Sequence, residues 1–294
     1  EQQRDIKAQT LFDSLERIGK VMPGERLEPL TGESWNYRRR ARLAVKDVPA
    51  KGRVLVGFRE RHAPFIAEME RCEVLAEPVD GMLLALSELI GNLSIRARLP
   101  QIEVAVADNA VALVFRVLDP PSDSDLEHFR AFGKQHELQV WLQPGGLDSL
   151  ECTWPDPNPE PLIYALSHSD VTIEFEPIDF VQVNADINER MVQTAIDWLE
   201  PGPDDRVLDL FCGIGNFTLP IARRAGHVLG IEGEASLVAR ASANASRNGL
   251  DNAEFRTADL AKIDGTEGWF DGSWDRLLLD PCLLYTSDAA DDLA

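Results

Sequence analysis

The stretch at residues 206–216, RVLDLFCGIGN, constrains the fold of this chain more than any other part of the sequence. An apolar run reaches an acid, Asp209, and two glycines, Gly213 and Gly215, follow before a helical pattern begins. Glycines at such a place let the backbone turn sharply and approach a ligand closely. From here to residue 280, short apolar runs alternate with helical patterns over short links, which predicts a parallel, doubly wound α/β sheet.

The residues around this turn indicate which ligand the sheet binds. A dinucleotide-binding turn has a third glycine where this chain has Thr218. Asp209 would repel phosphate, and it suits a ligand with a cationic amino-acid end, such as S-adenosylmethionine. Glu232, Asp259 and Asp280 end the next three predicted strands. Because ligands of such sheets bind beyond the carboxyl ends of the strands, we expect Glu232 at the ribose hydroxyls and Asp259 near the adenine.

Residues 1–179 follow a different pattern. Two alternating runs, at residues 41–48 and 52–59, predict a pair of strands. Helices are expected at 7–21, 80–93 and 123–136, and further strands as far as residue 176. This mixture indicates an α+β domain with antiparallel pairing. We therefore expect an α+β domain at 1–179, a boundary near residue 180, and the α/β domain at 180–281.

Charge is distributed very unevenly along the chain. The net charge is −21, yet residues 35–61 hold nine basic and two acidic side chains, a net of +7, so the rest carries −28. We call residues 35–61 the basic island. It can attract a polyanion to one face of an acidic protein, and the alternative is a solvated basic loop. The side chains that we expect to contact RNA are Tyr37, Arg38, Arg39, Arg40, Arg42, Arg59 and Arg61.

Several motifs together resemble those of a known enzyme family. FVQVNADIN at 180–188, VLDLFCGIGNFTLP at 207–220, GIEG at 230–233 and LLLDP at 277–281 are similar to motifs of the RNA uracil-5-methyltransferases. NYRRRARLAV at 36–45 and ERCEVL at 70–75 resemble the branch that acts on 23S ribosomal RNA. The resemblance implies a class I, Rossmann-like S-adenosylmethionine methyltransferase domain, incomplete in this chain. It also implies that an α+β domain of the RNA-binding and iron–sulfur type precedes it.

The resemblance also implies which side chains contact the cofactor. Asp209, Gly213 and Gly215 are expected in the crevice from the residues themselves. Phe211 can stack on an apolar face of the ligand, and Asn216 is expected to cap the start of the next helix. The contacts that the family implies are Gln182, Phe211, Asn216, Glu232, Asp259 and Asp280.

Cysteine use gives one further expectation. The family implies a four-cysteine iron–sulfur cluster in the parent enzyme, with three ligands upstream of Glu1 and Cys72 as the fourth, so we expect no cluster to assemble in this chain. Taken alone, a single cysteine is more typical of a small buried apolar side chain, and Cys152 and Cys212 are interpreted in that way. The four cysteines are far apart in the sequence, which argues against a disulfide framework and favours a cytoplasmic setting.

The end of the chain bears on catalysis. In the family that this chain resembles, a cysteine adds to the 6-position of uracil, the 5-position takes the methyl group, and a base removes the 5-proton. Both groups are expected beyond residue 281, so we expect no catalytic residue in this chain. Residues 282–294, CLLYTSDAADDLA, have the character of a non-native tail. Cys282 is interpreted as a chance neighbour of Pro281, although a Pro-Cys pair after a strand is also where cytosine-5 DNA methyltransferases carry their nucleophile.

The resemblance thus implies methylation of the 5-position of a uridine in 23S ribosomal RNA, by an enzyme of which this chain is a catalytically incomplete part. The alternatives are a non-catalytic RNA-binding module, or a methyltransferase that acts on transfer RNA or another substrate. No apolar run approaches the ~18–20 residues of a membrane span, so no membrane partner is expected. We expect a monomer.

Overall fold

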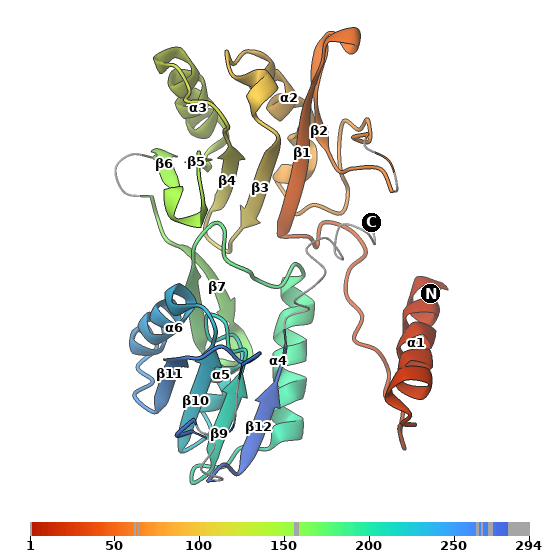
Figure 1. Ribbon diagram of the computed structural model, residues 1–294, viewed down its shortest axis with the longest axis vertical. Helices are drawn as coiled ribbons and strands as arrows, with labels where there is room; N and C mark the ends of the chain where they lie inside the picture. The colour runs from red at the N-terminus through yellow and green to blue at the C-terminus, as the bar shows by residue number, and fades with distance from the viewer. Residues whose placement is uncertain are drawn as a thin grey trace. The chain divides into compact units, whose positions relative to one another are not determined.

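The structure, a computed structural model, describes residues 2–61, 63, 65–155, 159–262, 265, 267–269 and 273–281 (Figure 1). The chain divides into two compact units, Glu1–Gly32 and Glu33–Ala294. Among the helices that the structure describes, none combines the length and the apolar character that a membrane span requires.

The first unit is built around one helix. Helix α1 spans Gln2–Ser14 and continues into a short π-helical turn at Leu15–Gly19, so the helix begins and ends earlier than the predicted 7–21. Neither segment buries a residue. The Arg26 guanidinium lies 3.9 Å from the centre of the Phe12 ring, which is a cation–π contact.

The second unit begins with a six-stranded sheet. Its strands lie in the order β2 (Arg53–Gly57), β1 (Arg40–Val48), β3 (Gln101–Val106), β4 (Val111–Arg116), β5 (Gln139–Gln143) and β6 (Glu151–Trp154). All neighbours are antiparallel except β4 and β5, which are parallel. Helices α2 (Leu83–Gly91) and α3 (Asp123–His136) contribute side chains to the same apolar core. The α+β pattern predicted for this region is therefore present.

Strand β1 keeps the alternation that the sequence predicts. Ala41, Leu43 and Val45 enter the core, whereas Arg42 and Lys46 are exposed on the other face. The 3-10 turns span Pro49–Lys51, Val79–Gly81, Arg96–Arg98, Leu147–Ser149 and Ser167–Ser169.

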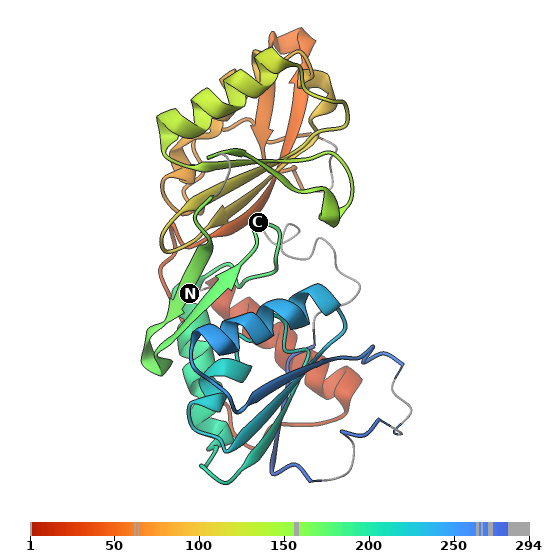
Figure 2. The same cartoon turned by 90° about the vertical axis from the view of Figure 1, so that its left-hand side faces the viewer.

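A two-stranded ribbon follows, formed by β7 (Leu162–Leu166) and β8 (Val171–Phe175). Its apolar side chains, among them Leu162, Ile173 and Phe175, belong to the second core together with residues after 180. This second core also includes Ala105 of β3 and Ala112 of β4, so the cores mark no single boundary, and the expected boundary near residue 180 stays a prediction. Two views show the ribbon between the six-stranded sheet and the next sheet (Figures 1 and 2).

The last part of the chain forms the predicted parallel sheet. Its order is β11 (Ala253–Thr257), β10 (His227–Glu232), β9 (Arg206–Leu210) and β12 (Arg276–Leu279), and every pair is parallel. Helices α4 (Ala185–Leu199), α5 (Thr218–Ala222) and α6 (Ala235–Arg247) alternate with the first strands. The chain moves from β9 outward to β11 and then returns to the other side of β9. Such a reversal of strand order is where ligands of α/β sheets bind.

Candidate functional site

Acidic side chains gather at the carboxyl edge of the parallel sheet. The register pairs Leu210 with Ile231 in β10 and with Leu279 in β12, so these strands end together. Glu232 is the last residue of β10, and Asp280 directly follows β12. Asp259 comes two residues after β11, and Asp209 is one residue inside the end of β9. The structure thus places the four expected acids at one edge.

The turn after β9 adopts the backbone that its glycines allow. Gly213 has φ +55° and Gly215 has φ +97°, both in the left-handed region that side chains rarely adopt. A Cβ atom on Gly215 would lie 3.0 Å from Leu219 Cγ, so this glycine permits close packing against α5. A Cβ atom on Gly213 would meet no atom within 4 Å. The backbone at Gly213 therefore faces open space into which a ligand can come.

Glu232 is held beside this turn by backbone donors. Its Oε2 accepts a hydrogen bond from the Gly213 N–H at 3.0 Å. Its Oε1 accepts two, from the Gly233 N–H at 2.6 Å and from the Glu234 N–H at 3.4 Å. The side chain is only half-buried. Each carboxylate oxygen has two lone pairs, so Oε2 retains one of them for a further donor. The carboxylate is therefore oriented by three backbone donors, and its Oε2 is able to accept a further hydrogen bond, as a ribose hydroxyl would offer.

Asp209 has a different environment, because it is 1% exposed. The hydroxyl of buried Thr218 donates a 2.5 Å hydrogen bond to its Oδ2, and its Oδ1 has no partner among the described residues. Burial raises the pKa of Asp209 to about 7, and the negative charges of Asp280 and Glu232 act in the same direction. Thr218, which replaces the third glycine of a dinucleotide-binding turn, thus supplies the donor that a glycine would lack.

Asn216 does not have the role expected from the sequence. Helix α5 begins at Thr218 with Phe217 as its N-cap residue and without a side-chain cap, so the prediction that Asn216 caps this helix is wrong. The Asn216 amide instead forms two reciprocal hydrogen bonds with the Asn188 amide, each 2.9 Å long. The hydroxyl of Tyr164 donates a third, at 3.0 Å, to Asn216 Oδ1. Sequence patterns do not reveal Asn188 and Tyr164 as neighbours of Asn216, because these residues lie far from Asn216 along the chain.

A pocket lies next to this group of amides. Gln182, an expected cofactor contact, forms part of its wall. Its floor is mostly apolar, which is typical of small-molecule pockets with a few polar groups. The lining residues are Arg39, Val106, Tyr164, Ala165, Phe175, Val181, Gln182, Ala185 and Asn188.

The remaining expected contacts are more exposed. Asp259 accepts hydrogen bonds from Lys262 Nζ at 2.7 Å and from the Ala261 N–H at 3.1 Å, and the Lys262 bond lowers the pKa of Asp259. Asp280 is exposed at the end of β12. Phe211 is half-buried and has φ +65°, with its N–H donating to Ile231 O. These positions leave all three side chains able to meet a ligand at the sheet edge.

Cys72, expected as one ligand of an iron–sulfur cluster, lies against apolar side chains. Cys72 packs against the first apolar core, and its N–H donates to Asp80 O at 2.9 Å. Over the described ranges of the chain, no group of three or more His, Cys, Asp or Glu side chains could hold a metal. The iron–sulfur cluster that the family implies is therefore not supported. Cys212 is buried, which raises its thiol pKa. Cys282 lies outside the described residues.

The structure brings acidic partners to several cations of the basic island. Arg39 pairs with Asp108. In β1, Arg40 and Arg42 lie on the same face as Glu103 of β3, at 3.8 Å and 3.4 Å from its carboxylate. The Arg40 side chain is only 13% exposed, and its guanidinium also donates to Pro177 O. Arg40 is thus a structural residue, whereas Arg42 is 49% exposed.

The other expected RNA contacts lie beside these strands. Arg38 lies 6.0 Å from the Phe58 ring centre, and it and Tyr37 are half-buried. Arg59 and Arg61 are exposed, and neither forms an ion pair with another residue that the structure describes. The chain therefore offers fewer available cations than its sequence suggested.

The sequence of this chain is similar to those of known methyltransferases. Residues 164–261 match the tRNA (Uracil-5-)-methyltransferase family. The 23S rRNA (uracil(1939)-C(5))-methyltransferase RlmD of Stenotrophomonas maltophilia is 48% identical over 281 residues, covering 96% of this chain and 63% of that protein. RlmD of Alkalilimnicola ehrlichii is 50% identical over the same number of residues, with the same coverage.

A solved structure shares the fold. The Pyrococcus abyssi tRNA (uracil-54, C5)-methyltransferase, solved in complex with S-adenosyl-L-homocysteine, superposes with a TM-score of 0.64 at 19% identity. It covers 85% of this chain, which covers 61% of that structure. The chain spans 63% of the length of the RlmD relatives described above. This chain thus contains a match to the tRNA (Uracil-5-)-methyltransferase family at residues 164–261, and it is similar to the RlmD proteins along 96% of its length.

Proposed function

We propose that this chain is part of an S-adenosylmethionine-dependent enzyme that methylates the 5-position of a uridine in 23S ribosomal RNA. The observation that carries the proposal is the half-buried Glu232 carboxylate, held by the Gly213 and Gly233 N–H groups at the open side of the glycine turn. The relatives with 48–50% identity are named as 23S rRNA methyltransferases, which supports the RNA class.

The described residues fit this cofactor by their chemistry. When bound, S-adenosylmethionine supplies a methyl group on a positively charged sulfur. Glu232 accepts a hydrogen bond from a ribose hydroxyl, and Phe211 covers an apolar face of the ligand. Asp259 would meet the adenine of the bound cofactor, and Asp280 would be a further contact at the same edge of the sheet. A cluster of acids at this edge attracts a cationic ligand and repels phosphate, which disfavours a dinucleotide.

The RNA meets the exposed cations of the basic island. Arg42, Arg59 and Arg61 are exposed and contact phosphates, with Tyr37 available to stack on a base. The target uridine leaves its stack, because its 5-position cannot be reached inside a helix. No step of this proposal uses an iron–sulfur cluster, since Cys72 packs against the first core.

This chain by itself does not transfer the methyl group in our proposal. The nucleophile of such a reaction is a thiolate, and burial raises the pKa of the Cys212 thiol. Cys72 packs against the first core, and Cys152 donates to Pro155 O at 3.4 Å, far along the chain from the cofactor turn. The assay is transfer of labelled methyl from S-adenosylmethionine to a 23S rRNA fragment. Incorporation that disappears in Cys282→Ala would show that Cys282 is a nucleophile and would contradict this part.

The substrate class is tested by binding. A filter-binding competition would measure how well unlabelled 23S rRNA fragment and unlabelled tRNA displace a labelled 23S rRNA fragment from this chain. We expect the rRNA fragment to compete at least ~10-fold better than tRNA at physiological salt, because specific sites exceed non-specific ones by such factors or more. Equal competition by both would remove the 23S assignment, and better competition by tRNA would reverse it.

A further inference from the structure

Three polar side chains from three elements meet behind the glycine turn. Tyr164 comes from β7, Asn188 from α4, and Asn216 from the turn before α5. The Asn216 Oδ1 accepts from Tyr164 Oη at 3.0 Å and from Asn188 Nδ2 at 2.9 Å. The Asn216 Nδ2 donates to Asn188 Oδ1 at 2.9 Å. We call Tyr164, Asn188 and Asn216 the amide triad, after the two asparagine amides at its centre.

Counting hydrogen bonds shows what the triad leaves for a ligand. A side-chain amide has an oxygen with two lone pairs and a nitrogen with two hydrogens. Both lone pairs of the Asn216 oxygen are used, and one of its two N–H groups is used. Toward a ligand, Asn216 therefore has one N–H donor and no acceptor. It can meet a carboxylate oxygen, but it has no lone pair for an ammonium.

The surroundings of Asn216 keep its oxygen occupied and leave its remaining N–H as the donor. Burial raises the pKa of Tyr164, so its hydroxyl keeps its proton and remains a donor. Its ring packs beside Phe175, with ring centres 5.9 Å apart. Asn188 is 4% exposed and lies in the first turn of α4, which the Asn184 side chain caps. Both partners of Asn216 are thus held by the fold and cannot easily exchange with water.

We propose that Tyr164 and Asn188 are positioning residues of the cofactor site, which orient the Asn216 amide so that its remaining N–H donates to the carboxylate of the cofactor's methionine end. This inference rests on the proposed function, because it requires Asn216 to contact the cofactor. It specifies that Asn216 is the donor and the cofactor carboxylate is the acceptor in that contact. The two positioning residues also line the pocket that holds Gln182, so they stand beside a second expected cofactor contact.

The experiment is titration calorimetry on the full 294-residue chain with two ligands. S-adenosylhomocysteine carries the amino-acid carboxylate, and 5′-methylthioadenosine lacks that end. Tyr164→Phe removes only the hydroxyl that donates to Asn216. We expect it to weaken S-adenosylhomocysteine binding by about 3- to 10-fold, the effect of one hydrogen bond, and to leave 5′-methylthioadenosine binding unchanged.

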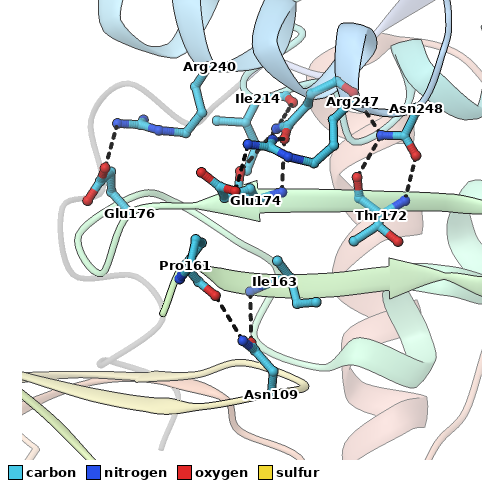
Figure 3. Close-up of polar contacts among 11 residues, drawn as sticks. Asn109, Pro161, Ile163, Thr172, Glu174, Glu176, Ile214, Arg240, Arg247 and Asn248 are labelled. Atoms are coloured by element: carbon cyan, nitrogen blue, oxygen red, sulfur yellow. Dashed lines mark hydrogen bonds and ion pairs between the residues drawn. The ribbon is translucent and has the colours of Figure 1, made fainter. Parts of the chain in front are cut away.

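A double-mutant cycle separates positioning from a general effect on structure. In an Asn216→Ala background, Tyr164→Phe should have no further effect on S-adenosylhomocysteine affinity, because its acceptor is gone. Asn109→Ala is the matched control: it removes amide hydrogen bonds to Pro161 O and the Ile163 N–H on the same ribbon without touching Asn216 (Figure 3). It should leave the affinity for both ligands unchanged.

The outcomes are distinct. If Asn216→Ala leaves S-adenosylhomocysteine affinity unchanged, the cofactor role of Asn216 fails. If Asn216→Ala weakens binding and Tyr164→Phe does not, the positioning inference alone is overturned. Equal losses with both ligands, or an equal loss in the Asn216→Ala background, would also overturn it. Should Tyr164→Phe not fold, Asn188→Asp replaces it, since a carboxylate of the same shape cannot donate to Asn216 Oδ1.

Discussion

At the residue scale, the acids of the sheet edge show both what the sequence reveals and what it hides. Their position follows from strand periodicity alone, because parallel strands end at one edge. Their environments do not follow from it. Asp209 is 1% exposed and bonded to Thr218, whereas Asp259 and Asp280 are exposed. Only the packing of the turn over β9 separates them, and that packing depends on residues far along the chain.

The buried Asp209 leads to a pH-dependent prediction. Its pKa is raised from 3.8 to about 7, so the native state binds this proton more tightly than the unfolded state. The free energy of unfolding then falls as the pH rises from about 4 to about 7, by up to roughly 4 kcal/mol at ~1.4 kcal/mol per pKa unit. Asp209→Asn removes this titration. In urea unfolding from pH 4 to 8, the free energy of unfolding of Asp209→Asn should increase relative to that of the wild type as the pH rises.

The matched control for this prediction is Asp259→Asn, an exposed acid at the same edge. Its stability relative to the wild type should not increase across the same pH range. A constant difference between Asp209→Asn and the wild type from pH 4 to 8 would show that Asp209 is ionised in the native protein throughout. The assigned burial of its charge would then be incorrect.

At the element scale, the β7–β8 ribbon is the part that sequence patterns assigned least well. Alternation predicted its strands, but two short apolar strands do not reveal which core they join. Both edges of the ribbon are closed by asparagine side chains in place of further strands (Figure 3). Asn109 bonds the edge of β7, and Asn248 bonds both the N–H and the C=O of Thr172 in β8. Edge strands need such partners, because their backbone groups are otherwise unpaired.

Asn244 of helix α6 and Asn248, the C-cap residue of that helix, are two such asparagines one turn apart, and they allow a paired prediction. Asn248→Ala removes the bonds to Thr172 and should lower the free energy of unfolding by ~1–3 kcal/mol without changing cofactor affinity. Asn244→Ala removes bonds to Glu174 and should destabilise similarly. Asn244 also donates to Ile214 O in the glycine turn at 3.3 Å, so this variant should in addition weaken S-adenosylhomocysteine binding.

Chemical denaturation and calorimetry on the same two variants check this. Ser246→Ala, an exposed site on the same helix, is the control and should change stability by less than ~0.5 kcal/mol. Equal cofactor affinity in Asn244→Ala and Asn248→Ala would show that the Ile214 contact does not hold the turn.

At the scale of the whole molecule, the charge distribution is less extreme than the sequence suggests. The basic island has a net charge of +7 when it is counted along the chain. In the fold, Asp108 and Glu103 come from β3 and the residues after it, and Glu68 pairs with Lys51 and Arg53. A count over residues 35–61 cannot include such partners, because they lie outside that range and approach it only in the fold. The prediction of RNA contact therefore narrows to the exposed cations.

Two arginines of β1 test whether only the exposed cations contact RNA. Arg42→Gln should reduce the slope of log affinity for single-stranded RNA against log salt by ~0.7, the value for one phosphate contact. Arg40→Gln should leave the slope unchanged and lower stability, because its guanidinium is 13% exposed and bonded to Pro177 O. Filter binding at several salt concentrations measures both. Equal slope changes for the two variants would contradict the assignment of Arg40 as structural.

The central claim is that the open edge of the parallel sheet binds S-adenosylmethionine through Glu232, and titration calorimetry with S-adenosylhomocysteine and NAD⁺ tests it most directly. We expect one molecule of S-adenosylhomocysteine to bind per chain, and NAD⁺ to bind far more weakly. Glu232→Ala removes the charge-assisted hydrogen bonding of the ribose, worth ~1.5–3 kcal/mol per bond before compensation, and should reduce the affinity at least ~10-fold. Unchanged affinity in Glu232→Ala, or tighter binding of NAD⁺ than of S-adenosylhomocysteine, would contradict the account.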